Sequence, residues 1–455
     1  MNAITDIASQ GLTRVLAEQA RTLTYADLPE DVRKLARQCL VDYLACTLAG
    51  SKDELASILL AEMAEQGGAP IATVIGHNQR LPVLAAAVVN GASSHALDYD
   101  DVNLAMTGHP SVVLLSALLP LAEERGSSGI DVMTAFVAGY ELQCRLGLAL
   151  APGHYNVLGF HATGTLGSFG AAAACAHLLR LNEAQFATAL GIAGTQAAGL
   201  KSMFGTMCKP LHAGKAAYHG LFAARLAQRG FTARADIVEC EQGFARTHSP
   251  DWRPERALAT PPRGFHILNN LFKYHAACYM THAPIEAARE LREQHGLRPE
   301  QIARIKLGLD ETCDRICNIP APRTGLEAKF SLRLTTAMAL AGINTGGLES
   351  YSEQTAADPT LIALRDKVEF DFRSGVSNTL ADMELVLTDG RTVSTSYDSG
   401  VPASDIDEQG RRIDEKFTSL AEPMLGRAKA DELLGEIGKL EQLPDLRGMM
   451  RHCAV

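Results

Sequence analysis

The sequence is poor in aromatic residues: it has one tryptophan, and Phe, Trp and Tyr together make up 5% of its 455 residues. Strands are enriched in aromatic and β-branched side chains, so this shortage, with the long runs rich in Ala and Gly, favours closely packed helices. The chain is also too long for one small hydrophobic core, and its length suggests two to three domains.

The ten cysteines include no CxxC pair, which argues against a zinc site or a disulfide framework. Cys313 and Cys317 are four apart and could share a helix face, and we expect them to be buried, inert thiols. No run approaches the roughly 18 apolar residues that a membrane span needs, and the first residues lack the basic and apolar regions of a secretory signal. We therefore expect a cytoplasmic location and no membrane partner.

Basic residues are outnumbered, since the formal net charge is −10. This balance argues against a nucleic-acid partner, which needs a clustered basic face. It does not exclude an anionic substrate, because a few local cations or helix N-termini can hold one.

Apolar residues recur at helical spacing from residue 4 to about 230, and again from 408 to 445. The first stretch predicts helices over residues 4–21, 29–48, 53–66, 82–97, 111–124, 130–149, 163–180, 183–197 and 211–228. The segment 231–270, with its polar turns and prolines, is predicted to be a connection over the surface.

The pattern changes after residue 270. Residues 302–309 alternate with period two, and residues 383–397 predict two strands around an Asp389-Gly390 turn, with helices over 284–295 and 330–341. The predicted fold is therefore mainly α: an all-helical domain built from both ends of the chain, with a smaller α+β domain inserted. The expected boundaries are 1–270 for the helical domain, 271–400 for the α+β domain and 401–455 for C-terminal helices that pack back on the first domain.

Ionisable side chains are concentrated between residues 95 and 111, in an apolar neighbourhood where unpaired charge is costly. His95 and Asp98 are three apart and are predicted to share a helix face. With Asp100, Asp101 or His109 they could bind a divalent metal, although no second His or Cys cluster supports this. A carboxylate beside a histidine could equally serve general acid–base catalysis.

Three cation-capable side chains stand at predicted helix starts. His109 precedes Pro110 and Lys209 precedes Pro210, and because proline favours the first helical position, we expect both side chains just before a helix. His161 precedes a start made of small residues. Each of them alone is more often a turn, cap or surface residue. Together, three such helix ends would bind carboxylates.

A fourth cluster lies at residues 272–282, where the second domain is expected to begin. A lysine, two histidines, two tyrosines and a thiol at a domain junction suit a site in a cleft, and Lys273 is the residue expected to reach a substrate. In the alternative interpretation, Tyr274, Cys278 and His282 are spaced by four and form one buried helix face.

Five motifs stand out along the chain. They are Asp98-Tyr-Asp-Asp101, Gly108-His-Pro-Ser111, Phe160-His-Ala-Thr-Gly-Thr-Leu-Gly167, Gly205-Thr-Met-Cys-Lys-Pro-Leu-His-Ala-Gly214 and Phe272-Lys273. In them the chain resembles the MmgE/PrpD family, which includes 2-methylcitrate dehydratase, cis-aconitate decarboxylase and iminodisuccinate epimerase. The resemblance covers nearly the whole length. It implies a helical domain with an inserted α+β lid, a homodimer, and chemistry on small polycarboxylates without metal or cofactor.

The resemblance also implies which residues act. The family's active-site residues match Asp98, His109, His161, Lys209 and Lys273, and we expect substrate contacts from Cys278, His275, Lys201 and Ser111.

The chain departs from the decarboxylase branch of the family at three positions. Cys278 replaces a histidine, Leu334 a tyrosine and Val102 a threonine. Cys278 is similar to the epimerase branch, and the Phe-Pro-Ala-Glu-Phe-His phrase of dedicated methylcitrate dehydratases is absent.

The expected chemistry is removal of a proton from the carbon next to a substrate carboxylate. Lys209, Lys273 and helix N-termini would hold the carboxylates and the developing charge, while Asp98, His109 or His161 would act as base and acid. We expect a dehydratase-like lyase, with epimerisation or decarboxylation as alternatives. A metal-dependent hydrolase using the His/Asp segment and a non-catalytic carboxylate-binding protein remain as other classes.

Overall fold

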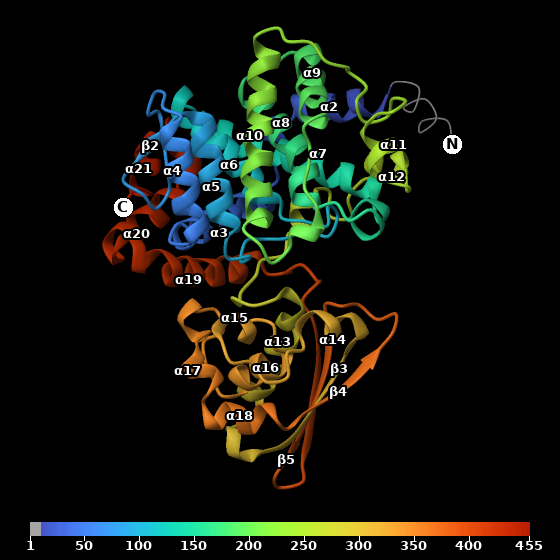
Figure 1. Cartoon of the computed structure of the whole chain (residues 1–455), viewed down its shortest axis with the longest axis vertical. Coiled ribbons are helices and arrows are strands. Elements are labelled where there is room, and N and C mark those ends of the chain that lie inside the picture. Colours follow the sequence, from blue (N-terminus) through green and yellow to red (C-terminus); the bar gives the residue numbers. More distant parts are fainter. Residues whose placement is uncertain (1–10) are drawn as a thin grey trace. The chain divides into compact units, whose positions relative to one another are not determined.

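The computed structural model describes residues 11–455, which are mostly helical, as predicted, with a two-stranded and a four-stranded β-sheet (Figure 1). The chain forms two compact units, Met1–Phe272 with Ser404–Val455, and Lys273–Ala403. The predicted helix over residues 4–21 begins outside the described residues.

The first unit consists largely of helices that the apolar spacing had predicted. Its long helices are α2 (Leu12–Thr22), α3 (Glu30–Gly50), α4 (Glu54–Glu65), α5 (Val83–His95), α6 (Pro110–Arg125), α7 (Gly129–Leu150), α8 (Ala162–Leu178), α9 (Glu183–Gly194), α10 (Cys208–Gln228), α19 (Ile406–Leu425) and α20 (Arg427–Ile437). Nearly every side chain of α8 is buried, and most are Ala, Gly or other small residues, so α6, α7 and α10 pack closely around it. Because α6 and α10 both pack on α8, these three helices form one closely packed group in the first unit.

Two glycines allow α5 and α10 to approach each other backbone to backbone. A Cβ on Gly91 would lie 2.7 Å from the Cα of Gly214, and a Cβ on Gly214 would lie 2.3 Å from the carbonyl oxygen of Val88. No side chain fits at such distances, so the small residues determine how near the start of α10 lies to the end of α5.

Gly214→Ala is therefore expected to lower the free energy of unfolding by about 1–3 kcal/mol, because the methyl group must push the two helices apart. Gly435→Ala in α20 is the matched control, since no atom lies within 4 Å of its added Cβ. There, the better helix propensity of alanine is expected to stabilise by up to about 1 kcal/mol. Urea denaturation measures both values, and equal effects at the two sites would contradict the close approach.

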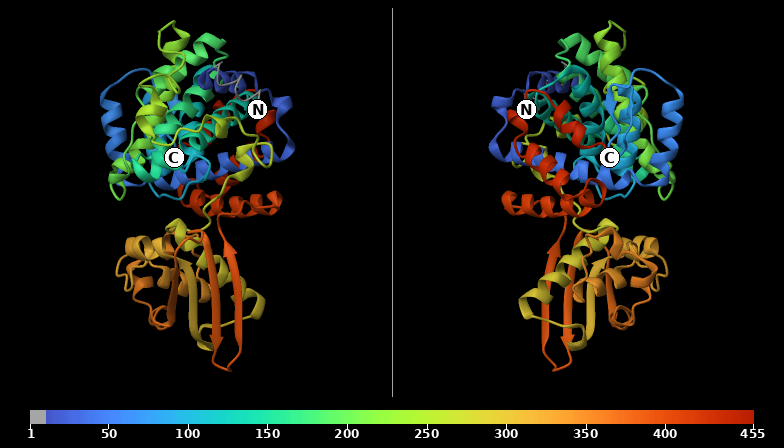
Figure 2. Two further views of the ribbon diagram at one scale, coloured as in Figure 1. Left: turned by 90° about the vertical axis from the view of Figure 1, so that its right-hand side faces the viewer. Right: turned by 90° about the vertical axis from the view of Figure 1, so that its left-hand side faces the viewer.

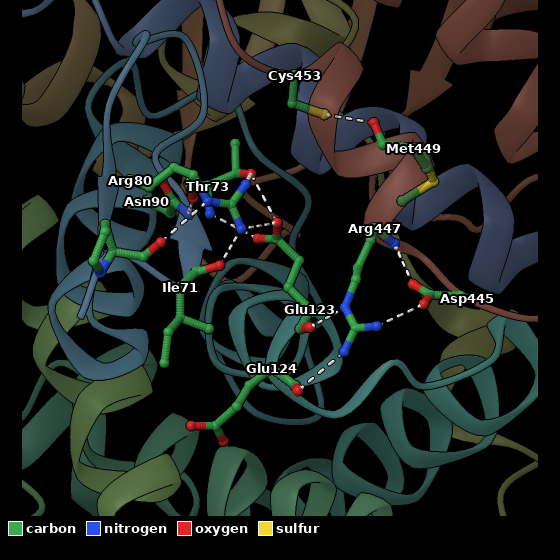
Figure 3. Close-up of polar contacts among 11 residues, drawn as sticks. Ile71, Thr73, Arg80, Asn90, Glu123, Glu124, Asp445, Arg447, Met449 and Cys453 are labelled. Carbon is green, nitrogen blue, oxygen red and sulfur yellow. Dashed lines mark hydrogen bonds and ion pairs between the residues drawn. The ribbon is translucent and has the colours of Figure 1, made fainter.

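The C-terminal helices lie beside N-terminal ones (Figure 1). Helix α19 packs on α3, and the short α21 (Arg447–His452) packs on α6. Figure 3 shows the polar contacts at the end of α6: the Arg447 guanidinium donates to the carbonyl oxygens of Glu123 at 2.7 Å and Glu124 at 3.2 Å. These carbonyls have no partner within the helix, so the C-terminal segment caps α6.

The side chain of Glu123 joins α6 to a small hairpin that the sequence did not predict, β1 (Ala72–Thr73) and β2 (Arg80–Leu81). Its carboxylate is 1% exposed and accepts hydrogen bonds from the Thr73 amide at 2.7 Å and from the Thr73 hydroxyl at 2.8 Å (Figure 3). Arg80 lies 3.1 Å from the same carboxylate, so the buried charge is paired.

The second unit contains the four-stranded sheet, ordered β4-β3-β5-β6 (Figure 2). The strands are β3 (Ile302–Asp310), β4 (Val368–Arg373), β5 (Leu380–Leu387) and β6 (Thr392–Asp398). Strand β3 pairs in parallel with β4 and antiparallel with β5, and β5 forms the predicted hairpin with β6 around Asp389-Gly390. Strand β4 was not predicted. Helix α13 (His282–His295) packs on β5 and β6, and α16 (Leu332–Leu340) packs on α13.

The prediction of a surface connection over residues 231–270 is wrong. This segment contains α11 (Phe244–His248), α12 (Pro254–Leu258) and the 3-10 turn η4 (His266–Asn269), and its apolar residues Val238, Phe244 and Ile267 are buried. Short helical turns of four or five residues are too brief to show a 3.6-residue period, which is why the sequence pattern missed them.

Candidate active site

Two histidines stand at helix N-termini as predicted. His109 is the residue before α6, with φ −104°, and His161 is the residue before α8, with φ −83°. Neither side chain caps its own helix. Both imidazoles therefore make their contacts elsewhere, close to the positive ends of two long helices.

The prediction that Lys209 stands just before a helix is wrong, because Lys209 lies inside α10. Helix α10 begins at Cys208, whose amide donates to the Thr206 hydroxyl at 3.2 Å, so Lys209 already lies in the first turn. Pro210 is tolerated there since amides in the first turn have no partner within the helix. The ammonium group still lies at the N-terminal end of α10.

The side chains of Lys209 and His109 both lie close to the carboxylate of Asp98. Its Oδ1 lies 2.8 Å from the Lys209 Nζ and 3.4 Å from the His109 Nε2. The backbone of Asp98 is in the left-handed region, with φ +50°, which aspartate adopts more readily than most residues. The Asp98 side chain is 45% exposed, although the Oδ1 that lies near Lys209 and His109 is itself buried.

The Asp100 carboxylate lies next to the other ring nitrogen of His109, Nδ1. One of its oxygens lies 3.1 Å from the His109 Nδ1, and the other 2.9 Å from the Nδ1 of His95. Burial alone would raise the pKa of the Asp100 carboxyl, but the attraction of His109 and His95 holds it well below its usual value. An ionised carboxylate at Nδ1 favours the tautomer that carries its proton there, which leaves Nε2 of His109 facing Asp98.

The predicted helix face shared by His95 and Asp98 is wrong. Helix α5 ends at His95, and Asp98 lies in the loop beyond it, so His95 pairs with Asp100 instead. Burial lowers the pKa of His95 to about 4, although Asp100 opposes this shift. His95 is therefore a neutral, buried neighbour of His109, with 4.5 Å between the ring centres.

His161 lies against the same group. Its ring is stacked on His95 at 5.8 Å, and its Nδ1 lies 3.1 Å from the Nδ1 of His212. Burial, and then the positive charge of its neighbours, lowers the pKa of His161 well below its usual value, so the ring is neutral. His212 was not predicted as a site residue, although it belongs to the motif that ends at Gly214.

The structure gives contacts for the two remaining predicted residues of this unit. The Lys201 Nζ donates to the Tyr155 carbonyl at 3.3 Å and lies 3.8 Å above that ring. Ser111 is 2% exposed, and its hydroxyl donates to the Asp101 carboxylate at 2.5 Å. A substrate contact from Lys201 or Ser111 stays a prediction.

Lys273, His275 and Cys278 belong to the second unit. His275 is buried between the Thr345 hydroxyl at 2.7 Å and the Glu286 carboxylate at 3.1 Å, and the Cys278 amide donates to the Lys329 carbonyl at 3.0 Å. The alternative of one helix face from Tyr274 through Cys278 is wrong, because α13 begins only at His282. Lys273 is 2% exposed, and its approach to a substrate stays a prediction.

Four side chains of the first unit are close enough to bind one metal ion. One ligand atom each from His95, Asp98, Asp100 and His109 lies within 4.8 Å of the others. The Lys209 ammonium is already 2.8 Å from Asp98 and would repel a divalent cation bound there. The donor set therefore fits a divalent metal ion poorly.

Two family models match the chain and together cover most of its length. Residues 14–257 match the model of the MmgE/PrpD N-terminal domain, and residues 275–442 match that of the MmgE/PrpD C-terminal domain. The chain belongs to the MmgE/PrpD family. Asp98, His109, His161 and Lys209 all lie in the stretch matched by the N-terminal model of the MmgE/PrpD family.

Among MmgE/PrpD proteins, the chain is 28% identical to the cis-aconitate decarboxylase of Aspergillus terreus, over 97% of this chain and 96% of that protein. It is also 28% identical to the human cis-aconitate decarboxylase, over 96% of this chain and 93% of that protein. A cis-aconitate decarboxylase-like protein, oryM, of Aspergillus oryzae is 32% identical over 64% of each chain. The relatives are enzymes by name. Between residues 11 and 455 no helix is long and apolar enough to cross a membrane.

Proposed function

We propose that this chain is a lyase that removes a proton from the carbon next to a carboxylate of a small di- or tricarboxylate, without a metal or an organic cofactor. The observation that carries the proposal is the meeting of the Lys209 ammonium and the His109 imidazole on one partly exposed carboxylate, Asp98. A cation, an oriented imidazole and helix N-termini are what such a reaction needs.

The proposed roles follow from the contacts. His109, fixed by Asp100 at Nδ1, would take the proton through Nε2, and Lys209 would stabilise the charge that develops on the substrate carboxylate. His161 is neutral and would exchange a proton on another face of the substrate. Asp98 keeps Lys209 and His109 in place, and Lys273 and Cys278 are the expected contacts from the lid.

Two lyase reactions remain candidates. In a dehydration, which we expect first, the base takes the proton, its electron pair forms the double bond, and the hydroxyl of the neighbouring carbon leaves with a proton as water. In a decarboxylation, the bond to the carboxylate breaks, carbon dioxide leaves, and an acid protonates the carbon that keeps the electron pair, so the same groups would deliver a proton instead of removing one. The names of the relatives favour decarboxylation, whereas Cys278, Leu334 and Val102 depart from that branch. Epimerisation stays a further alternative.

Product analysis in heavy water tests the proposal. The purified protein is incubated in D₂O with cis-aconitate and with a panel of di- and tricarboxylates of about four to seven carbons, and products are followed by NMR. We expect one member to acquire deuterium next to a carboxylate and to give a single product, whose structure distinguishes dehydration, decarboxylation and epimerisation.

Three results would contradict the proposal. Absence of both deuterium incorporation and product formation in every member of the panel would contradict proton transfer. A stoichiometric divalent ion, with activity lost to a chelator, would support the metal-dependent hydrolase. Saturable binding without turnover would support a carboxylate-binding protein.

The expectation of a homodimer rests on the family resemblance. Analytical ultracentrifugation measures the oligomeric state.

A further inference from the structure

A buried ion pair lies behind the loop that carries the candidate site. Helix α19 lies beside α3 (Figure 1). Between them, the Nζ of Lys416 in α19 is 2.6 Å from the Oδ1 of Asp42 in α3. The two side chains are 4% and 1% exposed. Removing two charges from water costs several kcal/mol per ion, and a well-packed apolar pair often serves stability equally well. Stability alone therefore does not account for these charges.

Both members of the pair hold the backbone of the loop after α5. The Lys416 ammonium donates to the Tyr99 carbonyl at 2.7 Å and lies 3.8 Å above the Tyr99 ring. The Asp42 carboxylate accepts the backbone amide of Asp101. An apolar residue could supply neither hydrogen bond.

Tyr99 and Asp101, whose backbone groups make these hydrogen bonds, are next in sequence to Asp98 and Asp100. Asp100, which orients His109, lies between Tyr99 and Asp101, and Asp98 directly precedes Tyr99. Asp98 also has a left-handed backbone conformation, which the surrounding contacts must maintain. A shift of the loop by about one ångström would move Asp98 relative to Lys209 and His109.

We propose that Lys416 is a positioning residue that, together with Asp42, fixes residues 98–101 in the geometry that proton transfer requires. This inference rests on the proposed function, because it assigns Lys416 a role in the same site. Lys416 lies in the C-terminal segment, after the second unit in the chain, and has no place among the residues that the family motifs indicate.

The double variant Asp42→Leu with Lys416→Met tests the inference, because it removes both charges and leaves neither buried alone. Its matched control is Lys34→Met with Asp407→Leu. That pair joins the same two helices at the same distance of 2.6 Å, but its side chains are 26% and 76% exposed and lie outside the loop. Two quantities are measured: kcat and KM on the substrate found in heavy water, and hydrogen exchange of the peptide that spans residues 96–104.

We expect the buried double variant to lose kcat by about tenfold or more, with KM changed by less than about threefold, since a small misplacement affects the transition state most. Amide exchange in the loop is expected to become about tenfold faster or more, because the Asp101 amide loses its acceptor. The control is expected to change neither quantity.

The two measurements separate the possible failures. Unchanged loop exchange in the folded double variant would overturn the inference alone. Faster exchange with unchanged kcat would overturn the positioning role of Lys416 and of the loop, while the activity observed in heavy water would still support the proposed function. If the double variant does not fold, Lys416→Arg decides: its planar guanidinium keeps the charge but not the geometry, and it is expected to lower kcat by about threefold or more. Unchanged kcat and exchange in Lys416→Arg would overturn the inference.

Discussion

His109→Asn is expected to lower kcat by about 10²–10⁴-fold, the range that general acid–base groups contribute. The imidazole is the group that Asp100 orients, with its Nε2 directed to the carboxylate of Asp98. Asparagine is among the best residues at the position before a helix, so α6 is expected to keep its start and the fold its stability. The initial rate of deuterium incorporation, measured by NMR on the substrate found in the panel, gives the loss directly.

His219→Asn is the control for His109, because His219 lies in α10 and makes no contact with the Asp98 group among those described above. Its kcat is expected to stay within about twofold of the unaltered protein. A His109→Asn protein that is folded and keeps more than about a tenth of the unaltered kcat would remove His109 from the chemistry.

Lys209→Met is expected to lower kcat/KM by about 10²–10³-fold, the usual loss when one preorganised charge or donor is removed from a developing anion. Methionine has a similar length but no charge, so the substrate carboxylate loses its counter-ion while the first turn of α10 persists. Part of the loss is expected in KM, because the ground-state carboxylate is already charged. This division distinguishes Lys209 from His109, whose loss is expected mainly in kcat.

Lys215→Met provides the comparison on the same helix. Lys215 lies in α10 with its ammonium 4.4 Å above the Tyr218 ring, and it is exposed. Its kinetic constants are expected to remain within about twofold. Equal losses in Lys209→Met and Lys215→Met would indicate a general effect of charge on substrate approach, and Lys209 would then have no specific role.

Local patterns were enough to predict most of the fold. Helices such as α2 and α19 repeat buried apolar residues at the 3.6-residue period over three or more turns, and the β5–β6 hairpin has alternating residues around Asp389-Gly390. The parallel pairing of β3 with β4 depends on residues more than sixty positions apart, which no local period encodes. The start of α10 was misplaced because the proline rule marks the first turn and not a single residue.

The sequence indicated several residues that lie near one another in the structure, but it did not indicate how their side chains pair. Asp98, His109, His161 and Lys209 were named from their residue types and motifs, and the structure brings these four together in one unit. The pairing of Asp100 with two imidazoles was not predicted, because it depends on the end of α5 at His95 and on the turn that follows. Nothing in the sequence indicated that Lys416 is buried and contacts the loop, since an isolated lysine in an amphipathic helix is normally a surface residue.

The anchoring of the loop from the C-terminal segment has a consequence for synthesis of the chain. Lys416 is separated from Asp42 by 374 positions, and Arg447 from the carbonyl of Glu123 by 324. A polypeptide emerging from the ribosome completes the helices α5, α6, α8 and α10 long before it contains these partners. If Lys416 positions the loop as proposed, the first unit reaches its final loop geometry only after the second unit, Lys273–Ala403, has been synthesised, because Lys416 follows that unit in the chain.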